Sequence, residues 1–334
     1  LSWEFEAGLH AAEFNIEAPE DTGYQLATLQ GVPLFHVTGS HAVMLSCYRA
    51  QRKLVCMYKW DANFAAELID REKIASFVGP AAMTGDLVEI SKTTDFDLSS
   101  LAVVGGGGAP RAPDQVKNIG TAFGSALPNT GWGMTETNAI GTGIGGHDYL
   151  DHPDSAGRAA TIVDVRIADE EGNEVSTGER GEVQIKGATL FEGYWNRPDA
   201  NAEAMTGDWL QTGDVGFFNE EGYLYIVDRI KDLVIRGGEN IGCAEVEAAL
   251  LEHDQILEAS VYGVLDERLG EEVGATIYCG GSSLSEQLLH DFLVQRIARF
   301  KVPRYLKISV DPLPRIATGK IDKKRLREIA RQEA

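Results

Sequence analysis

The chain has few cysteines, and their spacing does not suggest a metal site or a disulfide framework. Its 334 residues include only Cys47, Cys56, Cys243 and Cys279, and no two of them form a C-x-x-C pair. Structural zinc sites and disulfide-rich scaffolds need closely and regularly spaced cysteines. We therefore expect separate thiols in a reducing compartment, which indicates a cytoplasmic protein.

Positive charge and long apolar runs are also scarce. Lysine and arginine number 30 against 51 acidic residues, so the formal net charge is −21, which argues against general nucleic-acid binding. No apolar run approaches the roughly 20 residues of a membrane span, and no signal-peptide pattern is visible. The chain opens at Leu1 without a methionine, which predicts a truncated or processed N-terminus. We expect small-molecule partners and no transmembrane segment, and a homodimer is left open.

The basic residues gather near the end of the sequence. Between residues 296 and 331, lysine and arginine far outnumber the acids Asp311, Asp322 and Glu328. Such a segment could receive an anionic ligand, or it could be the solvated face of a basic helix. The spacing alone does not decide between the two.

Strands and helices alternate from about residue 53 to 130. The pattern predicts strands over 53–58, 75–78 and 101–104, and helices over 63–73, from 81 to about 90, and over 113–123. Alternation of this kind predicts a parallel sheet covered on both faces, with ligands beyond the carboxyl ends of its strands.

The later sequence has a different pattern. Residues 163–167 and 181–185 alternate with a period of two and are separated by turn residues, which predicts an antiparallel or barrel-like part over 160–227. A small α+β unit is expected from about residue 232. We therefore predict an α/β protein with a large first domain over residues 1–229 and a small C-terminal domain over residues 230–334.

Five short motifs could bind a phosphorylated ligand, although each also has a purely structural explanation. Residues 105–110 (GGGGAP) follow a strand, where glycines allow close backbone approach or simply a tight turn. Residues 131–137 (GWGMTET) combine an aromatic ring with a hydroxyl and a carboxylate. Asp214 lies in a glycine-flanked turn, residues 228–241 fall at the domain boundary, and residues 314–321 place Lys320 on a small-residue loop.

Taken together, the order and spacing of these motifs resemble the adenylate-forming superfamily, which includes acyl-CoA synthetases, adenylation domains of peptide synthetases and beetle luciferase. Three further motifs carry the resemblance, namely residues 33–39 (PLFHVTG), 178–182 (GERGE) and 193–198 (GYWNRP). The resemblance covers nearly the whole chain, from about residue 33 to 321. It implies an AMP-forming acid–thiol ligase that uses ATP, Mg²⁺ and coenzyme A.

The resemblance also implies a role for each matching residue. Trp132 would stack on adenine, in place of the commoner tyrosine, and Lys231 would be the hinge. The expected catalytic residues are Thr135 at the α-phosphate, Glu136 as the magnesium ligand and Lys320. Nucleotide or coenzyme A binding is expected of Gly107, Gly108, Ala109, Pro110, Trp132, Gly133, Met134, Asp214, Arg229, Arg236, Gly237, Gly238 and Glu239, with Asp214 on the ribose. The pocket for the acid, fatty or aryl, is expected at His36, Val37, Val104 and Gly105.

One family motif is missing. The Ser/Thr/Gly-rich loop that closes over the β- and γ-phosphates normally precedes the motif at residue 33 and does not occur in this sequence. Three other functions stay open, and the missing loop bears on the last of them. They are an adenylation domain that loads a carrier protein, a luciferase-like oxygenase, and a nucleotide-binding fragment without catalytic activity.

Overall fold

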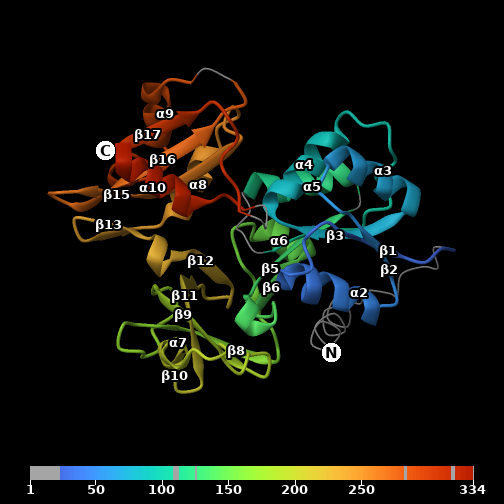
Figure 1. The fold of residues 1–334 in the computed structure, drawn as a ribbon, viewed down its shortest axis with the longest axis horizontal. Helices are drawn as coiled ribbons and strands as arrows, with labels where there is room; N and C mark the ends of the chain where they lie inside the picture. Colours follow the sequence, from blue (N-terminus) through green and yellow to red (C-terminus); the bar gives the residue numbers. More distant parts are fainter. Residues whose placement is uncertain (1–22, 108–112, 125, 282–283, 317–319, 334) are drawn as a thin grey trace. The chain divides into compact units, whose positions relative to one another are not determined.

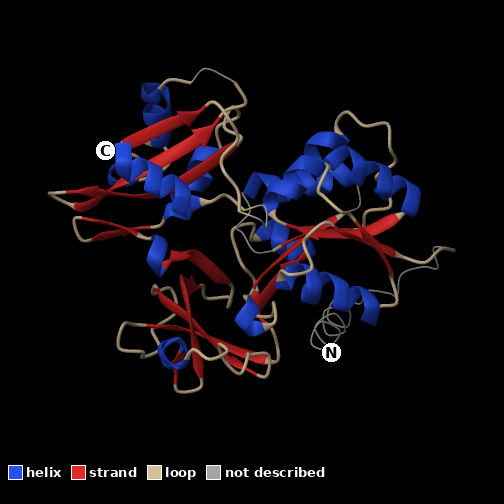
Figure 2. Cartoon of the chain, in the orientation of Figure 1, coloured by secondary structure: helices blue, strands red, loops and turns tan. Residues whose placement is uncertain are grey.

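The structure, a computed structural model, describes residues 23–107, 113–124, 126–281, 284–316 and 320–333. The chain forms two compact units. Unit 1 comprises Leu1–Thr212 and Phe217–Tyr225, and unit 2 comprises Gly213–Gly216 and Ile226–Ala334. Figure 1 follows both units along the chain, and Figure 2 distinguishes their helices from their strands.

Unit 1 contains a seven-stranded sheet with the spatial order β2-β1-β3-β4-β5-β6-β7. Pairs β1–β2, β1–β3, β3–β4 and β4–β5 are parallel, whereas β5–β6 and β6–β7 are antiparallel. The strands are β1 (Ala27–Gln30), β2 (Lys53–Cys56), β3 (Ile74–Gly79), β4 (Val103–Gly106), β5 (Leu127–Trp132), β6 (Thr142–Gly145) and β7 (Arg158–Ala159). The predicted parallel sheet is confirmed, with an antiparallel extension that the sequence did not suggest.

Helices cover both faces of the parallel strands. Helices α3, α4 and α5 lie on one face and α2 on the other (Figure 1). The helical segments of unit 1 are η1 (Thr38–Leu45, π-helical), α2 (Ser46–Arg49), α3 (Ala62–Glu72), α4 (Ala81–Ser91), α5 (Pro113–Phe123), the 3₁₀ turn η2 (Thr135–Thr137), α6 (Gly146–Asp151) and α7 (Pro198–Ala204). The helices predicted over 63–73, to about residue 90 and over 113–123 are confirmed as α3, α4 and α5.

Local signals fix the ends of α3. The side chain of Asp61 accepts a hydrogen bond from the backbone N–H of Phe64 at 2.9 Å, which satisfies an otherwise unpaired donor of the first turn. Lys73 follows the helix in the left-handed conformation, at a φ of 49°, and stops it. The helix therefore ends where the next buried strand, β3, begins.

The second sheet is antiparallel in both pairs β8–β9 and β10–β11. Its spatial order is β10-β11-β9-β8, and β12 pairs with β11. Its strands are β8 (Val163–Ala168), β9 (Gly181–Gly187), β10 (Met205–Thr206), β11 (Trp209–Phe218) and β12 (Leu224–Arg229). The predicted period-two strands over 163–167 and 181–185 are confirmed as β8 and β9.

Unit 2 is a small α+β structure around a third, mixed sheet. The order is β14-β13-β16-β15, and β17 lies parallel to β16. The elements are the 3₁₀ turn η3 (Ile230–Asp232), β13 (Val234–Arg236), β14 (Glu239–Ile241), α8 (Cys243–Leu251), β15 (Glu258–Asp266), β16 (Gly270–Tyr278), α9 (Glu286–Leu293), η4 (Arg299–Lys301), β17 (Tyr305–Ser309) and α10 (Lys323–Glu333). The predicted α+β unit is confirmed, although the sequence did not suggest the strands β13 and β14 and favoured a longer α9, to residue 297.

Many of the cations between residues 296 and 331 form ion pairs within unit 2. Their partners are carboxylates that come mostly from residues 232–272, outside the basic segment. The pairs include Arg296–Glu252 at 2.9 Å, Lys301–Glu245 at 2.6 Å, Arg304–Glu272 at 3.3 Å, Arg315–Glu258, Lys323–Glu247 at 2.9 Å and Arg327–Asp232 at 2.8 Å. Much of the basic charge therefore ties α9, β17 and α10 to the rest of the unit.

Within the described residues, no helix combines the length and the apolar character that a membrane span requires. The same residues contain no group of three or more His, Cys, Asp or Glu side chains placed to hold a metal ion.

Candidate active site

The glycine run begins within β4, at Gly105, where neighbouring groups approach the backbone closely. A Cβ atom on Gly105 would lie 2.4 Å from the side-chain oxygen of Asn129 and 2.8 Å from Cγ2 of Val78. Only glycine fits at such distances. Gly107 is less crowded, because its nearest contact would be the methyl group of Thr38 at 3.9 Å. The other three predicted adenine-flanking residues, Gly108, Ala109 and Pro110, lie outside the described residues.

The segment after β5 folds into a tight 3₁₀ turn. A Cβ atom on Gly133 would lie 2.7 Å from the carbonyl of Ala139, so the two ends of the turn nearly touch. The hydroxyl of Thr137 accepts the backbone N–H of Met134 at 3.1 Å and donates to its carbonyl at 3.2 Å. The turn leaves Thr135 exposed to solvent. Its hydroxyl is therefore accessible to an anionic ligand.

Trp132, at the end of β5, is half-buried. A Cβ atom on Gly141 would lie 2.7 Å from its ring, and the ring also packs against the cluster of Val163, Ile185 and Leu210. A glycine at 141 therefore makes room for the indole. Adenine stacking on the ring stays a prediction.

Glu136 has a hydrogen-bond partner that the sequence did not reveal. The hydroxyl of Tyr194 donates to Oε1 of Glu136 at 2.8 Å, and the backbone N–H of Phe191 donates to the carbonyl oxygen of Glu136, also at 2.8 Å. Burial raises the pKa of Tyr194 to about 12, and the neighbouring Glu136 carboxylate acts in the same direction. Tyr194 therefore stays a neutral donor that orients the carboxylate. Tyr194 and Glu136 lie 58 positions apart, so no local pattern in the sequence could link them. The motif at 193–198 was the only sequence feature that pointed to Tyr194.

The residues predicted for the acid pocket differ in exposure. Val104 is fully buried in the core of unit 1, together with Phe77 and Leu101, so its described contacts are those of a packing residue. Val37 is buried at the start of η1, and Nδ1 of the half-buried His36 accepts the backbone N–H of Thr38 at 3.2 Å. Their role beside an acyl group stays a prediction.

Three predicted residues lie together in unit 2. Asp214, on β11, is only 6% exposed, and Arg229 lies at the end of the neighbouring strand β12. Nε of Arg229 lies 3.0 Å from Oδ1 of Asp214. Burial lowers the pKa of Lys320, the Arg229 cation lowers it further, and the Asp214 carboxylate opposes both. The fold therefore brings Asp214, Arg229 and Lys320, which were predicted to bind the ribose, to bind the nucleotide and to act in catalysis, into one electrostatic cluster.

The predicted coenzyme A loop is a two-residue hairpin turn between β13 and β14. Gly237 and Gly238 have φ values of +59° and +91°, which glycine adopts without strain. Arg236 precedes the turn and makes a bidentate ion pair with the buried Glu272, at 2.6 and 3.0 Å. The hydrogen bonds with Glu272 raise the pKa of Arg236. Arg236 is thus held within the unit, while Glu239 at the start of β14 is exposed.

Lys231, the predicted hinge, lies in the 3₁₀ turn η3 between β12 and β13 and is exposed. Two aspartates flank it, and both make contacts with α8 or α10. Asp228 is 8% exposed and Asp232 pairs with Arg327. Neither aspartate was predicted from the sequence to be a site residue.

Two family profiles match the chain. The profile described as AMP-binding enzyme matches residues 7–195, and the profile described as AMP-binding enzyme C-terminal domain matches residues 245–320. These matches and the relatives below confirm the resemblance drawn from the motifs.

Proteins similar to the chain include several named CoA ligases. A long-chain-fatty-acid–CoA ligase of Mycobacterium tuberculosis is 34% identical over 96% of this chain and 63% of its own length. An indoleacetate–CoA ligase of Aromatoleum aromaticum is also 34% identical, over 90% of this chain and 59% of its own length. The o-succinylbenzoate CoA synthetase of Bacillus subtilis, solved with an acyl-adenylate, is 28% identical, with a TM-score of 0.82 over 97% of this chain and 64% of its own.

The chain thus spans about 63% of the length of the curated relative described first. Its fold, the order of its motifs and the AMP-binding profile, which covers more than half of the chain, agree with one another. The chain belongs to the AMP-binding enzyme family.

Proposed function

We propose that this chain is the greater part of an ATP-dependent acyl-CoA synthetase. A carboxylic acid would attack the α-phosphorus of ATP, which gives an acyl-adenylate and pyrophosphate. The thiol of coenzyme A would then attack the acyl carbonyl and release AMP. The observation that carries the proposal is the cluster of Asp214, Arg229 and Lys320, because it joins a ribose acceptor to a lysine that could neutralise charge on the reacting groups.

The remaining roles follow the predicted assignment. Trp132 would stack on adenine, and the exposed hydroxyl of Thr135 would contact the α-phosphate. Glu136 would contribute one oxygen ligand to Mg²⁺, held in place by its hydrogen bond from Tyr194. A single carboxylate fits this ion, which commonly takes one or two carboxylates and completes its shell with phosphates and water. When bound, the ion would neutralise phosphate charge.

The two domains would serve the two steps in turn. The small domain, predicted over residues 230–334, would present Lys320 during adenylate formation. It would then rotate about Lys231 and bring the hairpin at Gly238 to the adenylate. Conformational steps of this kind complete and then exchange catalytic groups in many enzymes.

The relatives support a fatty or aryl acid as substrate. Those named above act, by their names, on long-chain fatty acids, indoleacetate and o-succinylbenzoate. A panel of fatty and aryl acids, assayed for acid-dependent exchange of pyrophosphate into ATP, would identify the class. Absence of exchange with every acid, despite AMP binding, would favour the alternative of a nucleotide-binding fragment.

Calorimetric titration of the chain with AMP tests the nucleotide site. Trp132→Ala should weaken binding roughly tenfold or more through lost stacking on the base. Asp214→Ala should weaken binding through lost ribose hydrogen bonds. Trp195→Ala, which removes an indole that is 96% exposed, is the matched control and should leave the affinity unchanged. Unchanged affinity in both site variants would contradict the proposed nucleotide site.

A further inference from the structure

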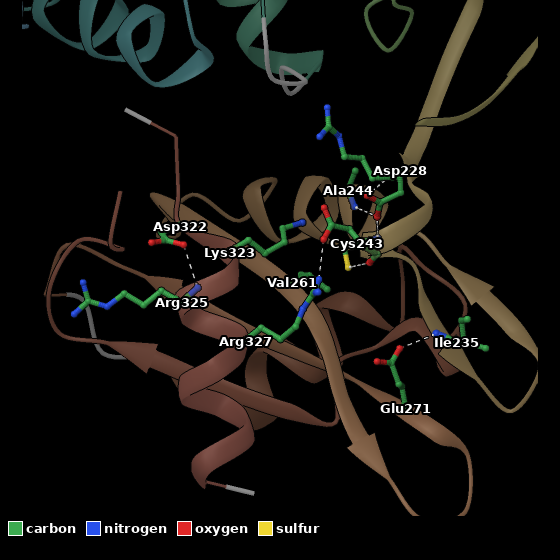
Figure 3. A network of polar contacts seen from close by, with 12 residues as sticks. Asp228, Ile235, Cys243, Ala244, Val261, Glu271, Asp322, Lys323, Arg325 and Arg327 are labelled. Carbon is green, nitrogen blue, oxygen red and sulfur yellow. Dashed lines mark hydrogen bonds and ion pairs between the residues drawn. The ribbon is translucent and has the colours of Figure 1, made fainter. Parts of the chain in front are cut away.

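The carboxylate of Asp228 connects the end of β12 to the start of α8 (Figure 3). Its Oδ2 accepts the backbone N–H groups of Cys243 and Ala244, the second at 3.3 Å, and its Oδ1 accepts the N–H of Arg229 at 2.7 Å. Burial raises the pKa of Asp228, whereas the Lys323 ammonium and these N–H groups oppose the shift. One buried side chain thus holds three backbone donors.

Helix α8 needs such an acceptor because its own N-cap residue cannot provide one. That residue is Gly242, and the first N–H groups of a helix lack partners within the helix. A Cβ atom on Gly242 would lie 3.1 Å from the carbonyl oxygen of Val227 and 3.2 Å from its Cγ1. The approach of β12 therefore favours glycine at 242 and leaves the capping to Asp228.

Asp232 makes a second set of contacts on the other side of Lys231. Its carbonyl oxygen accepts the thiol of Cys243 at 3.0 Å, and its Oδ1 pairs with Nη2 of Arg327 at 2.8 Å. Both aspartates therefore fasten the turn η3 to unit 2. They differ in position, because Asp228 precedes Lys231 and Asp232 follows it.

This difference decides which contacts a rotation would break. If the chain turns about Lys231, every residue after Lys231 moves as one body. Asp232, Cys243 and Arg327 would keep their contacts with one another. Asp228 would be carried away from α8 and would release the N–H groups of Cys243 and Ala244.

Lys320 and Asp214 have the same relation to the hinge. Asp214 precedes Lys231, Lys320 follows it, and the two charges influence each other in the present arrangement. The hydrogen bonds between Asp228 and α8 therefore exist in the same arrangement that places Lys320 near Asp214. An arrangement that places the lysine beside the ribose acceptor is the one that the first step requires.

We propose that Asp228 is a positioning residue for adenylate formation, because its carboxylate holds the start of α8 across the hinge and thereby stabilises the arrangement that presents Lys320. The proposal rests on the proposed function, in particular on rotation about Lys231. Asp228 would act through α8 and would touch neither ATP nor the acid.

Spin labels on the chain with AMP bound provide a readout that does not depend on catalysis. Cys56 is exposed in unit 1, the other three cysteines are buried, and Lys324, on α10 of unit 2, has a side chain that is 87% exposed. Labels at Cys56 and at Lys324→Cys would therefore report the distance between the units. Asp228→Ala should increase a second distance population roughly tenfold, in line with the loss of one or two net hydrogen bonds.

Two further variants separate this role from a general loss of stability. Asp228→Asn keeps one oxygen acceptor and should give a distance distribution between those of the unsubstituted chain and Asp228→Ala. The asparagine variant also tests the proposal if the alanine variant does not fold. Asp232→Ala breaks an ion pair that does not cross the hinge, so its distance distribution should match that of the unsubstituted chain. Thermal unfolding of each variant checks that the folded states are compared.

The half-reactions give the second readout, measured in a form of the enzyme that includes the phosphate loop. Asp228→Ala should lower the rate of adenylate formation roughly tenfold and leave thioester formation from synthetic acyl-adenylate unchanged. Suppose that the chain binds AMP and that Lys320→Ala strongly lowers adenylate formation, as the proposed function expects. Equal distance distributions for Asp228→Ala and Asp232→Ala would then overturn the proposal for Asp228 and leave the proposed function intact. Failure of the unsubstituted chain to bind AMP would overturn the proposed function and this inference with it.

Discussion

The two units bury different kinds of side chain. Among the described residues, the buried charged residues are Asp214, Asp228 and Glu272, and all three belong to unit 2. The buried polar side chains of unit 1 are neutral threonines, serines and glutamines around an apolar core. Both units have an apolar core, and that of unit 2 includes Val246, Val261 and Ile277. Unit 2 differs because buried carboxylates with bound partners are added to its core.

This difference has a consequence for function. Apolar packing is non-directional and tolerates small shifts, but a buried ion pair requires particular partners and leaves a costly charge when it is broken. If unit 2 takes up two defined arrangements, as proposed above, such all-or-none contacts would favour each of them over intermediates.

The largest effect is expected where the charges of unit 2 serve the reaction itself. Lys320→Ala should lower adenylate formation by a factor on the order of 10²–10³, because it removes the charge that offsets developing negative charge. It should still convert synthetic acyl-adenylate to thioester. Gly238→Trp should have the reverse effect, since a bulky side chain blocks the thiol. Pyrophosphate release and thioester formation measure the two steps, in a form of the enzyme that includes the phosphate loop.

Gly281→Trp is the matched control for the second substitution. Gly238 and Gly281 have φ values of +91° and +90°, and a Cβ atom on either would meet nothing within 4 Å. The two tryptophan variants therefore carry the same backbone strain, and only the one at 238 should impair the thioester step. If Lys320→Ala and Gly238→Trp lowered both half-reactions equally, the two-step use of the small domain would be wrong.

A smaller effect, on stability, compares the two units directly. Lys323→Met leaves the Glu247 carboxylate, whose pKa is raised by burial, without its ammonium partner at 2.9 Å, and should cost roughly 3 kcal/mol. Leu101→Ala in the core of unit 1 should cost about as much, through a cavity. Urea unfolding measures both changes.

The two losses should differ in whether they can be reversed. Glu247→Gln, added to Lys323→Met, removes the unpaired charge and keeps an oxygen for the N–H of Val261, which Glu247 accepts at 2.8 Å. The double variant should regain most of the lost stability, to within about 1 kcal/mol of the original. If Glu247→Gln gave no recovery, the ion pair would not be what stabilises this part of unit 2.

The same difference explains what could be predicted from the sequence. In unit 1 the parallel strands β2, β3 and β4 and the helices between them were predicted to within about two residues, because apolar residues recur with the period of each element. Strand β1 was missed because four residues are too few to display a period, and two of them, Thr28 and Gln30, are polar although they are buried. Strand β6, which contains two glycines, has no strand pattern at all.

The candidate site was predictable only residue by residue, from motifs. Motif order identified Asp214, Arg229 and Lys320, and the structure brings them together. The partners that hold site residues were not predictable. Tyr194 is 58 positions from Glu136, and an ion pair between distant residues has no period that a sequence could display.

The smallest expected effect concerns the pKa of Lys320 itself. Burial lowers this pKa, the Arg229 cation lowers it further, and the Asp214 carboxylate raises it. The ammonium therefore loses its proton at a lower pH than an ordinary lysine. Arg229→Gln removes a repelling charge and should raise the midpoint, whereas Asp214→Asn removes an attracting charge and should lower it. Arg296→Gln, at a cation that pairs with Glu252, should leave it unchanged.

Competitive labelling of amines measures these shifts without any requirement for catalysis. An acylating reagent reacts only with the neutral amine, so the extent of Lys320 labelling against pH gives the midpoint. Normalisation to the peptide that carries Lys324 corrects for reagent loss. Opposite shifts in the Arg229 and Asp214 variants would show that the charges of unit 2 act on the pKa of Lys320 as well as on the fold. Shifts in the same direction, or none, would mean that burial alone sets the pKa of Lys320 and that the three residues do not act as one cluster.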